Sequence, residues 1–364
     1  MGGSNMETTR NNRFSGHQLT RVLLTGGGII LAVAAIATFW KTTCDSLSLR
    51  RLAERQGLAI GSAVSGWQLS DPNYSSLLTR EFNLITPENA MKFGPLSPAP
   101  GQYDFTEADI IVAFAEEHGL QVRGHTLVWT NQLPDWLVDG DYTQGELLDI
   151  LHMHIQTVVG RYRGKVSYWD VVNEALADDG SIALNNFWME HIGSDYIALA
   201  FQWAHEADPA ALLFYNESYA EGKGQKTDGV FTLAQSLLAQ GVPIHGIGME
   251  MHTGLGWSPN PEELAENMQR IASLGLLVQI TEMDVRIEEP VTIDELNQQT
   301  QVYAEILQTC LEATNCTAIT TWGLTDAYSW IPYVYPGTGS ALIFDANSQP
   351  KPAYDAMIKV LRER

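Results

Sequence analysis

The chain has few basic residues, and this shortage excludes one class of partner. Its 364 residues include 21 Lys and Arg against 43 Asp and Glu, so the formal net charge is −22 at pH 7. A surface this acidic repels phosphate backbones and anionic lipid headgroups. We therefore predict that the protein does not bind nucleic acid.

Motifs for metal ions and cofactors are also missing. With three Cys and nine His, the sequence contains no His-Glu-x-x-His motif and no Cys/His spacing typical of a zinc site. His152 and His154 lie two residues apart on a predicted helix, where they point to different faces. We predict no catalytic metal and no cofactor.

The sequence shows no internal repeat larger than a strand with its following helix, and no low-complexity linker. A chain of this length can form one large domain, because α/β barrels of about 250 residues or more fold as single units. We predict that residues 46–364 form one domain and that residues 1–45 precede it as a tail.

A long apolar run lies in this tail. Residues 22–40 are 19 uncharged, mostly apolar positions between Arg21 and Lys41, with further Arg upstream. The run is close to the roughly 20 residues that span a bilayer, and the Arg bias places the N-terminus in the cytoplasm. A signal peptide cleaved near Ala35-Ile-Ala37 is an alternative, although the run is longer than the apolar core of a typical signal peptide. A buried core helix would need an upstream cover that the chain lacks.

Both favoured interpretations of this segment predict export. The segment is either a transmembrane anchor, which makes the membrane a partner, or a signal that is removed. In each case residues 46–364 lie outside the cytoplasm, whether extracellular, periplasmic or anchored to the membrane.

After the tail, short β-rich runs alternate with longer amphipathic stretches. We expect strands at residues 59–65, 84–86, 121–128, 166–172, 212–215, 244–249, 276–281 and 318–322. We expect helices at residues 107–117, 145–161, 195–207, 226–238, 261–274, 293–311 and 354–362. Eight strands, each followed by a helix, predict an α/β protein with a single (β/α)8 TIM barrel preceded by the hydrophobic segment.

Two of the strand-like runs end in a carboxylate. Glu174 ends Trp169-Asp-Val-Val-Asn-Glu-Ala175, and Glu282 lies in Ile280-Thr-Glu-Met-Asp284. The carboxyl ends of barrel strands meet at one mouth, where active sites form. Two Glu residues there suit chemistry at a glycosidic bond, because one must hold a proton while the other is charged. Among 43 acidic residues such a pair can arise by chance, so the residues around each Glu determine whether the pair indicates an active site.

Six motifs supply those neighbours. In chain order they are Asn83 to Lys92, Arg123 to Trp129, Trp169 to Ala175, Gly246 to His252, Ile280 to Asp284 and Thr321 to Asp326. With these motifs in this order, the sequence from about Leu49 to the C-terminus resembles glycoside hydrolase family 10, the retaining endo-1,4-β-xylanases. The resemblance implies a barrel enzyme, expected to be a monomer, that cuts internal β-1,4 linkages of xylan by double displacement on two carboxylates.

The resemblance also implies a role for each residue of the catalytic pair and its neighbours. Glu174 would be the general acid/base and Glu282 the nucleophile. Asn173 would hold the sugar 2-hydroxyl, a contact that strengthens in the transition state. His252 and Asp284 would form a hydrogen-bonded chain that keeps the Glu282 carboxylate oriented and charged.

Further residues match the family's substrate contacts. Polar contacts on the glycone side of the scissile bond are implied for Glu88, Asn89 and Lys92, with His125, Trp129 and Gln132 beside them. Trp322 and Trp330 match two tryptophans that wall the central subsite, where sugar rings stack on flat aromatic faces. A buried core position is the alternative for Trp129 and Trp322.

The resemblance further implies a short disulfide between Cys310 and Cys316, which an oxidising compartment would permit. Two buried free thiols are the alternative.

Two departures from the family pattern bear on activity. Thr130 stands where the family usually has His, and Glu250 where it usually has Gln. Glu250 would face Glu282 together with His252 and would therefore carry a proton to avoid like-charge repulsion. An impaired or non-catalytic polysaccharide-binding barrel, or an active hydrolase on another β-1,4-glycan, are the alternatives to a xylanase.

Overall fold

A computed structural model describes residues 1–3 and 48–364 of the protein. Residues Ser48–Arg364 form one compact unit. The hydrophobic run 22–40 lies outside the described residues, so the predictions of an anchor or signal and of a boundary after residue 45 stay predictions. Within the described part of the chain, no helix has the length and apolar character needed to cross a membrane.

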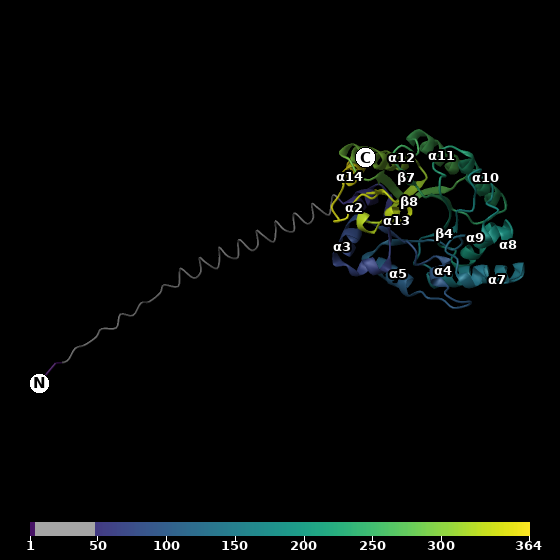
Figure 1. Ribbon diagram of the computed structural model, residues 1–364, viewed down its shortest axis with the longest axis horizontal. Coiled ribbons are helices and arrows are strands. Elements are labelled where there is room, and N and C mark those ends of the chain that lie inside the picture. Colours follow the sequence, from purple (N-terminus) through teal and green to yellow (C-terminus); the bar gives the residue numbers. More distant parts are fainter. Residues whose placement is uncertain (4–47) are drawn as a thin grey trace. The chain divides into compact units, whose positions relative to one another are not determined.

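Eight parallel strands close into a barrel in the order β1-β2-β3-β4-β5-β6-β8-β9, and β9 pairs again with β1. Figure 1 shows the helices arranged around these strands. The strands are β1 (Ala59–Val64), β2 (Leu84–Pro87), β3 (Gln121–Gly124), β4 (Tyr168–Asn173), β5 (Leu212–Glu217), β6 (Gly246–Met249), β8 (Leu277–Glu288) and β9 (Cys316–Thr321). The predicted (β/α)8 barrel is confirmed.

Helices follow the strands and cover the outside of the barrel. The longer ones are α3 (Pro72–Glu81), α5 (Thr106–His118), α7 (Gln144–Arg161), α9 (Asp195–Ala207), α10 (Gln225–Ala239), α11 (Pro261–Ser273), α12 (Ile293–Glu312) and α14 (Pro352–Arg362). Shorter ones are α2 (Leu49–Arg55), η1 (Gly66–Ser70), α4 (Phe93–Leu96), α6 (Asp135–Val138), α8 (Phe187–His191), η2 (Asp326–Tyr328) and α13 (Ile331–Val334). Because most of the short helices lie in loops after strands, they shape the mouth rather than the core.

Local chemistry sets several helix boundaries. The Asn260 side chain accepts hydrogen bonds from the backbone of Glu262 and Glu263, and Pro261 occupies the first helical position of α11. At the other end of a helix, Gly119 adopts φ 62° after α5, a left-handed conformation that glycine reaches at little cost. The predicted ends of these helices agree with the structure to within a few residues.

The seventh strand of the barrel departs most from the expected pattern. The strand expected at residues 276–281 is β8, which continues to Glu288. Two short strands support the extension: β7 (His252–Gly254) pairs with Asp284 to Arg286, and β10 (Thr338–Gly339) pairs with its end. Conversely, the strand expected at 121–128 ends at Gly124, and the following residues run into the mouth.

The barrel interior contains a buried ionic network. Arg123 on β3 donates from Nε to Asp170 on β4 at 2.9 Å, and its other nitrogens bind Asp170 and Gln279 of β8. All three side chains are almost inaccessible to solvent. A buried charge is tolerated only when it is paired and hydrogen-bonded, and here each ion has that partner.

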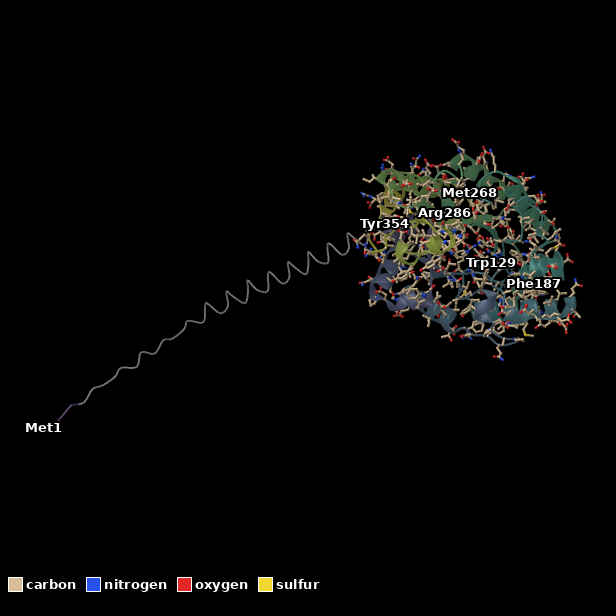
Figure 2. All side chains as sticks on the ribbon, in the orientation of Figure 1. Met1, Trp129, Phe187, Met268, Arg286 and Tyr354 are labelled. Carbon is tan, nitrogen blue, oxygen red and sulfur yellow. A yellow bond between two sulfur atoms is a disulfide. The ribbon has the colours of Figure 1, made fainter. Side chains whose placement is uncertain are left out.

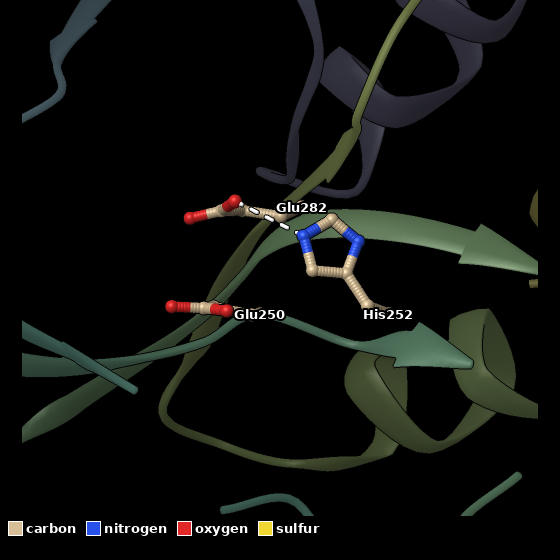
Figure 3. Close-up of side chains that lie close together, drawn as sticks. All are labelled: Glu250, His252 and Glu282. Atoms are coloured by element: carbon tan, nitrogen blue, oxygen red, sulfur yellow. Dashed lines mark hydrogen bonds and ion pairs between the residues drawn. The ribbon is translucent and has the colours of Figure 1, made fainter. Parts of the chain in front are cut away.

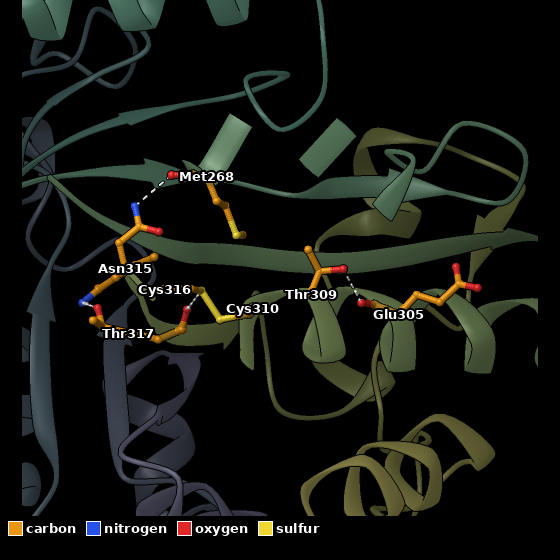
Figure 4. The surroundings of a disulfide bond; sticks show 9 residues. Met268, Glu305, Thr309, Cys310, Asn315, Cys316 and Thr317 are labelled. Carbon is orange, nitrogen blue, oxygen red and sulfur yellow. Dashed lines mark hydrogen bonds between the residues drawn. A yellow bond between two sulfur atoms is a disulfide. The ribbon is translucent and has the colours of Figure 1, made fainter. Parts of the chain in front are cut away.

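Cys310 and Cys316 are joined by a disulfide with a Cα–Cα distance of 5.2 Å. Figure 4 shows that the bond ties the end of α12 to the start of β9. Nearby, the Asn315 side chain donates to the backbone carbonyls of Met268 and Leu276, both at 3.0 Å. The turn into β9 is therefore held by one covalent and two hydrogen-bonded links.

Candidate active site

A cleft of about 420 Å³ opens at the carboxyl ends of the strands. Its lining consists of Glu88, Asn89, Lys92, His125, Trp129, Asn131, Gln132, Asn173, Glu174, Glu250, His252, Glu282, Trp322, Trp330 and Val334. Every residue predicted to act on or bind the substrate lines this cleft, except Asp284, which lies behind His252. A larger cavity of about 770 Å³ lies between η1 and α5, but neither candidate glutamate lines it.

Glu282 lies buried at the floor of the cleft and is hydrogen-bonded on both oxygens. Oε1 accepts from the Asn216 amide at 2.8 Å, and Oε2 lies 3.2 Å from Nε2 of His252. Burial alone would raise the pKa of Glu282, but the charges of His125 and Lys92 and the hydrogen bond from His252 outweigh it and lower the pKa. Glu282 is therefore held as a charged carboxylate.

His252 is oriented from behind by a second carboxylate. Its Nδ1 lies 2.8 Å from Oδ2 of Asp284, and the same oxygen accepts a hydrogen bond of 2.9 Å from Trp330. Burial alone would lower the pKa of His252, but Asp284 and Glu282 on either side of the ring raise it. The chain Asp284–His252–Glu282 thus places a cation beside the carboxylate.

Glu174 lies across the cleft in a different environment. It follows β4 with φ 50°, a left-handed backbone conformation that is uncommon outside glycine. Its N–H donates to the carbonyl of Asn216 at 3.0 Å, and its Oε2 accepts from Nε1 of Trp129 at 2.6 Å. The side chain stays partly accessible to solvent, unlike Glu282.

Asn216, at the end of β5, connects the functional groups of the floor. Its amide nitrogen donates to Asn173 at 2.7 Å and to Glu282 at 2.8 Å, with a longer contact of 3.3 Å to Glu250. The hydroxyl of Thr281 donates to its carbonyl oxygen at 2.7 Å, which fixes the orientation of the amide. Asn216 therefore acts as a positioning residue for both Asn173 and Glu282.

Glu250 follows β6 and is 3% exposed. Burial raises the pKa of Glu250 well above its ordinary value, and the charges of Glu282 and Glu174 raise it further. Figure 3 shows its carboxyl group beside the imidazole ring of His252 and the carboxyl group of Glu282, and one polar side-chain atom from each of the three lies within 4.8 Å of the others. The predicted proximity is present, although the chain is not a regular strand here, because Met251 has φ 65°.

The wall next to β2 is polar. Lys92 donates to the Asn89 side chain at 3.0 Å and lies 5.0 Å from the centre of the Trp129 ring. Burial lowers the pKa of Lys92, although the negative charges of Glu282 and Glu88 offset part of this effect. Elsewhere in the cleft, the ring centres of His252 and Trp330 are 4.7 Å apart, and those of His125 and Trp322 are 5.1 Å apart.

A model of glycosyl hydrolase family 10 matches residues 48–360, nearly the whole described domain. The chain belongs to glycosyl hydrolase family 10. Among its relatives, endo-1,4-beta-xylanase B of Thermotoga neapolitana is 40% identical over 340 residues, which cover 92% of this chain and 97% of the relative.

Solved structures of this family agree with the assignment. Native xylanase 10B from Thermotoga maritima matches with a TM-score of 0.83 and 44% identity, covering 87% of this chain and 98% of that one. Xylanase 10B from Thermotoga petrophila RKU-1, in complex with xylobiose, matches with a TM-score of 0.84 and 43% identity over 87% and 97% of the two chains. The protein is thus a glycoside hydrolase with a (β/α)8 barrel.

Thr130, one of the two residues of this family 10 hydrolase that depart from the family pattern, lies outside the cleft. The Thr130 hydroxyl accepts a hydrogen bond of 2.9 Å from the backbone N–H of Phe187, at the start of α8. Next to it, Nε1 of Trp188 donates to the carbonyl of Trp129 at 3.0 Å. Thr130 therefore fixes the loop that carries Trp129, whereas Glu250 faces the cleft itself.

Three residues at this hydrolase's site were missed by the sequence analysis. Asn131 and Val334 line the cleft, and Asn216 supports its floor. Asn216 follows an apolar run at the end of the fifth strand, which is the same signal that pointed to Glu174 and Glu282. Asn131 and Val334 lie in loops without such a signal.

Proposed function

We propose that this family 10 hydrolase is a retaining endo-1,4-β-xylanase in which Glu282 is the nucleophile and Glu174 the general acid/base. The contrast between the two carboxyl groups supports this assignment. Glu282 is buried among cationic groups that favour its charged form, whereas Glu174 is partly exposed and accepts a hydrogen bond from Trp129. A retaining glycosidase needs one carboxylate and one carboxylic acid at the same bond.

In the first step, the Glu282 carboxylate attacks the anomeric carbon of a bound xylose residue while Glu174 protonates the leaving oxygen. The products are a covalent glycosyl-enzyme and a released aglycone. Asn173, oriented through Asn216, would donate to the 2-hydroxyl as positive charge develops on the ring. His252 keeps one Glu282 oxygen in place, so the other faces the sugar.

In the second step, Glu174 takes a proton from water, and the resulting hydroxide displaces Glu282 from the anomeric carbon. The two inversions leave the product with the β configuration of the substrate. Trp129, whose indole binds Glu174, holds the acid/base group in place through both steps.

The choice of xylan as substrate rests on the relatives. The relative reported above is named endo-1,4-beta-xylanase B, and both solved structures are of proteins named xylanase 10B, one of them in complex with xylobiose. The predicted glycone contacts Glu88, Asn89 and Lys92 and the walls Trp322 and Trp330 all line one cleft, as a sugar groove requires. We further propose that the enzyme acts as a monomer outside the cytoplasm.

Proton NMR during hydrolysis of a soluble xylo-oligosaccharide tests the mechanism. We expect the first reducing ends to appear as the β anomer, and an initial α anomer would contradict the double displacement. A panel of xylan, cellulose and mixed-linkage glucan tests the substrate, with the Glu282→Ala variant as control. Binding of xylan without turnover would favour a non-catalytic barrel, and faster turnover of a glucan would favour another β-1,4-glycan.

A further inference from the structure

Arg286 lies on the extended part of β8, in line with Glu282 and Asp284 of the same strand. Glu282, Asp284 and Arg286 are alternate residues of one strand, and alternate residues share a face. Arg286 pairs with Gly254 of β7, the strand that begins with His252. Figure 2 shows Arg286 and Trp129 both toward the middle of the domain. Arg286 therefore lies above the nucleophile, toward the rim of the mouth.

Two aromatic rings hold the Arg286 guanidinium. Its central carbon lies 3.8 Å from the centre of the Tyr335 ring and 4.6 Å from that of Trp257. Gly254 makes the packing possible, because a Cβ atom there would lie 2.6 Å from Nε1 of Trp257. The Tyr219 ring lies 6.3 Å from that of Trp257 and extends the aromatic surface. A guanidinium stacked in this way is already ordered before any ligand binds.

Despite the acidic composition of the chain, no carboxylate neutralises Arg286. Within residues 1–3 and 48–364 its side chain forms no ion pair and no hydrogen bond, and its Nη1 atom is buried without a partner. The residue as a whole is only partly buried, so part of it remains accessible. Partly buried guanidinium groups usually bind a carboxylate or phosphate, because an unpaired buried N–H costs free energy. Arg286 is therefore charged and open to an anionic partner.

The strand order places Arg286 on the leaving-group side of the cleft. In the closed ring of strands, β2 is opposite β6, and β7, with which Arg286 pairs, follows β6. The glycone contacts Glu88 and Lys92 follow β2, so Arg286 lies across the mouth from them. Ring contacts connect it to the reaction centre, since Tyr335 lies 5.8 Å from Trp330 and Trp330 binds Asp284.

We propose that Arg286, between Trp257 and Tyr335, binds the carboxylate of a uronic acid branch carried by a xylose residue on the leaving-group side. This inference rests on the proposed xylanase function. The planar guanidinium can bind both carboxylate oxygens, and the flanking rings can contact the sugar ring of the branch. The acidic protein would otherwise repel an acidic xylan, and a fixed local cation counters that repulsion at the mouth.

A matched pair of substrates tests the proposal. One is a soluble xylan with glucuronic acid branches, and the other is the same polymer after chemical reduction of its carboxyl groups to hydroxymethyl groups. The measured quantity is the ratio of kcat/KM on the charged polymer to that on the reduced polymer. This ratio is independent of the fraction of active protein, so it remains valid for a variant that folds poorly.

At low salt we expect the wild type to prefer the charged polymer by about fivefold to tenfold, as for a partly exposed charge-assisted contact. Arg286→Gln should bring the ratio to about 1 or below, and Arg286→Lys should retain part of the preference because it keeps the charge. High salt should reduce the wild-type preference.

Arg270→Gln is the control. Arg270 also stacks on a ring, that of Phe231 at 4.8 Å, but it is paired with Asp228 and belongs to α11. The Arg270→Gln substitution removes one positive charge, as Arg286→Gln does, and should leave the ratio at its wild-type value. Equal rates of the wild type on both polymers, or a preference that survives in Arg286→Gln, would overturn the inference. Failure to cut either polymer would instead refute the xylanase function on which it rests.

Discussion

Replacing Glu250 by Gln removes a buried carboxyl group that lies close to the carboxylate of Glu282. Glu250 is almost inaccessible, it makes no ion pair within the described residues, and its hydrogen bond from Asn216 is long at 3.3 Å. Ionisation there would place a second negative charge beside Glu282, and an uncompensated buried charge costs several kcal/mol. We therefore expect Glu250 to work in its protonated form, in which it can donate a hydrogen bond to Glu282 or the sugar.

The size of the effect follows from the titration of one group. As pH rises above the raised pKa of Glu250, the protonated fraction falls about tenfold per pH unit, and kcat/KM of the wild type should fall with it. The Gln amide donates at every pH, so Glu250→Gln should keep its activity further into the alkaline range. At acid pH the two proteins should differ by less than about threefold, because both present a neutral donor.

The assay is kcat/KM for a soluble xylo-oligosaccharide against pH, measured for both proteins in buffers of equal ionic strength. Superimposable profiles would refute the reasoning, because another group would then set the alkaline limb. A uniform loss of activity in Glu250→Gln would instead show that the ionised carboxylate is needed.

The same substitution should also change how the stability of the protein depends on pH. The folded protein holds the Glu250 proton more tightly than the unfolded chain does, since the folded-state pKa is raised above 4.5. The resulting stabilisation is fully present below pH 4.5 and is lost as pH rises through the raised pKa. In thermal unfolding, the Glu250→Gln variant should therefore become more stable relative to the wild type as pH rises through this range.

Four further outcomes are expected. Glu174→Ala should slow xylan hydrolysis far more than hydrolysis of an aryl xylobioside with an activated leaving group, and equal losses would argue against an acid role. Asp170→Ala should lower the free energy of unfolding by about 3–5 kcal/mol in urea titrations, because it leaves Arg123 buried and unpaired. Cys310→Ser should cost about 2 kcal/mol or less, since the closed loop is short, which thermal unfolding would register as a shift of a few degrees. Full-length protein should fractionate with membranes while a form starting at residue 46 stays soluble and equally active; recovery of a soluble mature form starting near residue 38 would indicate a cleaved signal.

Much of the fold is readable from local patterns. The stretch predicted as a helix at 195–207 is α9 with the same ends, because its apolar spacing agrees with a helix that covers one face of a barrel. The extended part of β8 was not predictable in this way. It exists because β7 and β10 pair with it, and such partners come from distant segments whose approach no local pattern encodes.

The same limit applies to the site. Glu174 and Glu282 could be found because each ends an apolar run, where a barrel places its active residues, and because each lies in a motif of the family that the sequence resembles. The role of Asn216 could not, since its bonds to Asn173 and Glu282 join residues that are 43 and 66 positions away. Arg286 gave no signal either, because its environment depends on rings from two other loops.

The ionic network inside the barrel has a consequence for the way the fold assembles. Arg123 belongs to the third strand, Asp170 to the fourth and Gln279 to β8, on the other side of the ring. A partly closed sheet that buried Arg123 without Asp170 and Gln279 would leave its guanidinium desolvated and unpaired, which costs free energy. The network therefore penalises partly closed barrels and makes closure cooperative, so the floor beneath the catalytic groups forms only when the whole ring is complete.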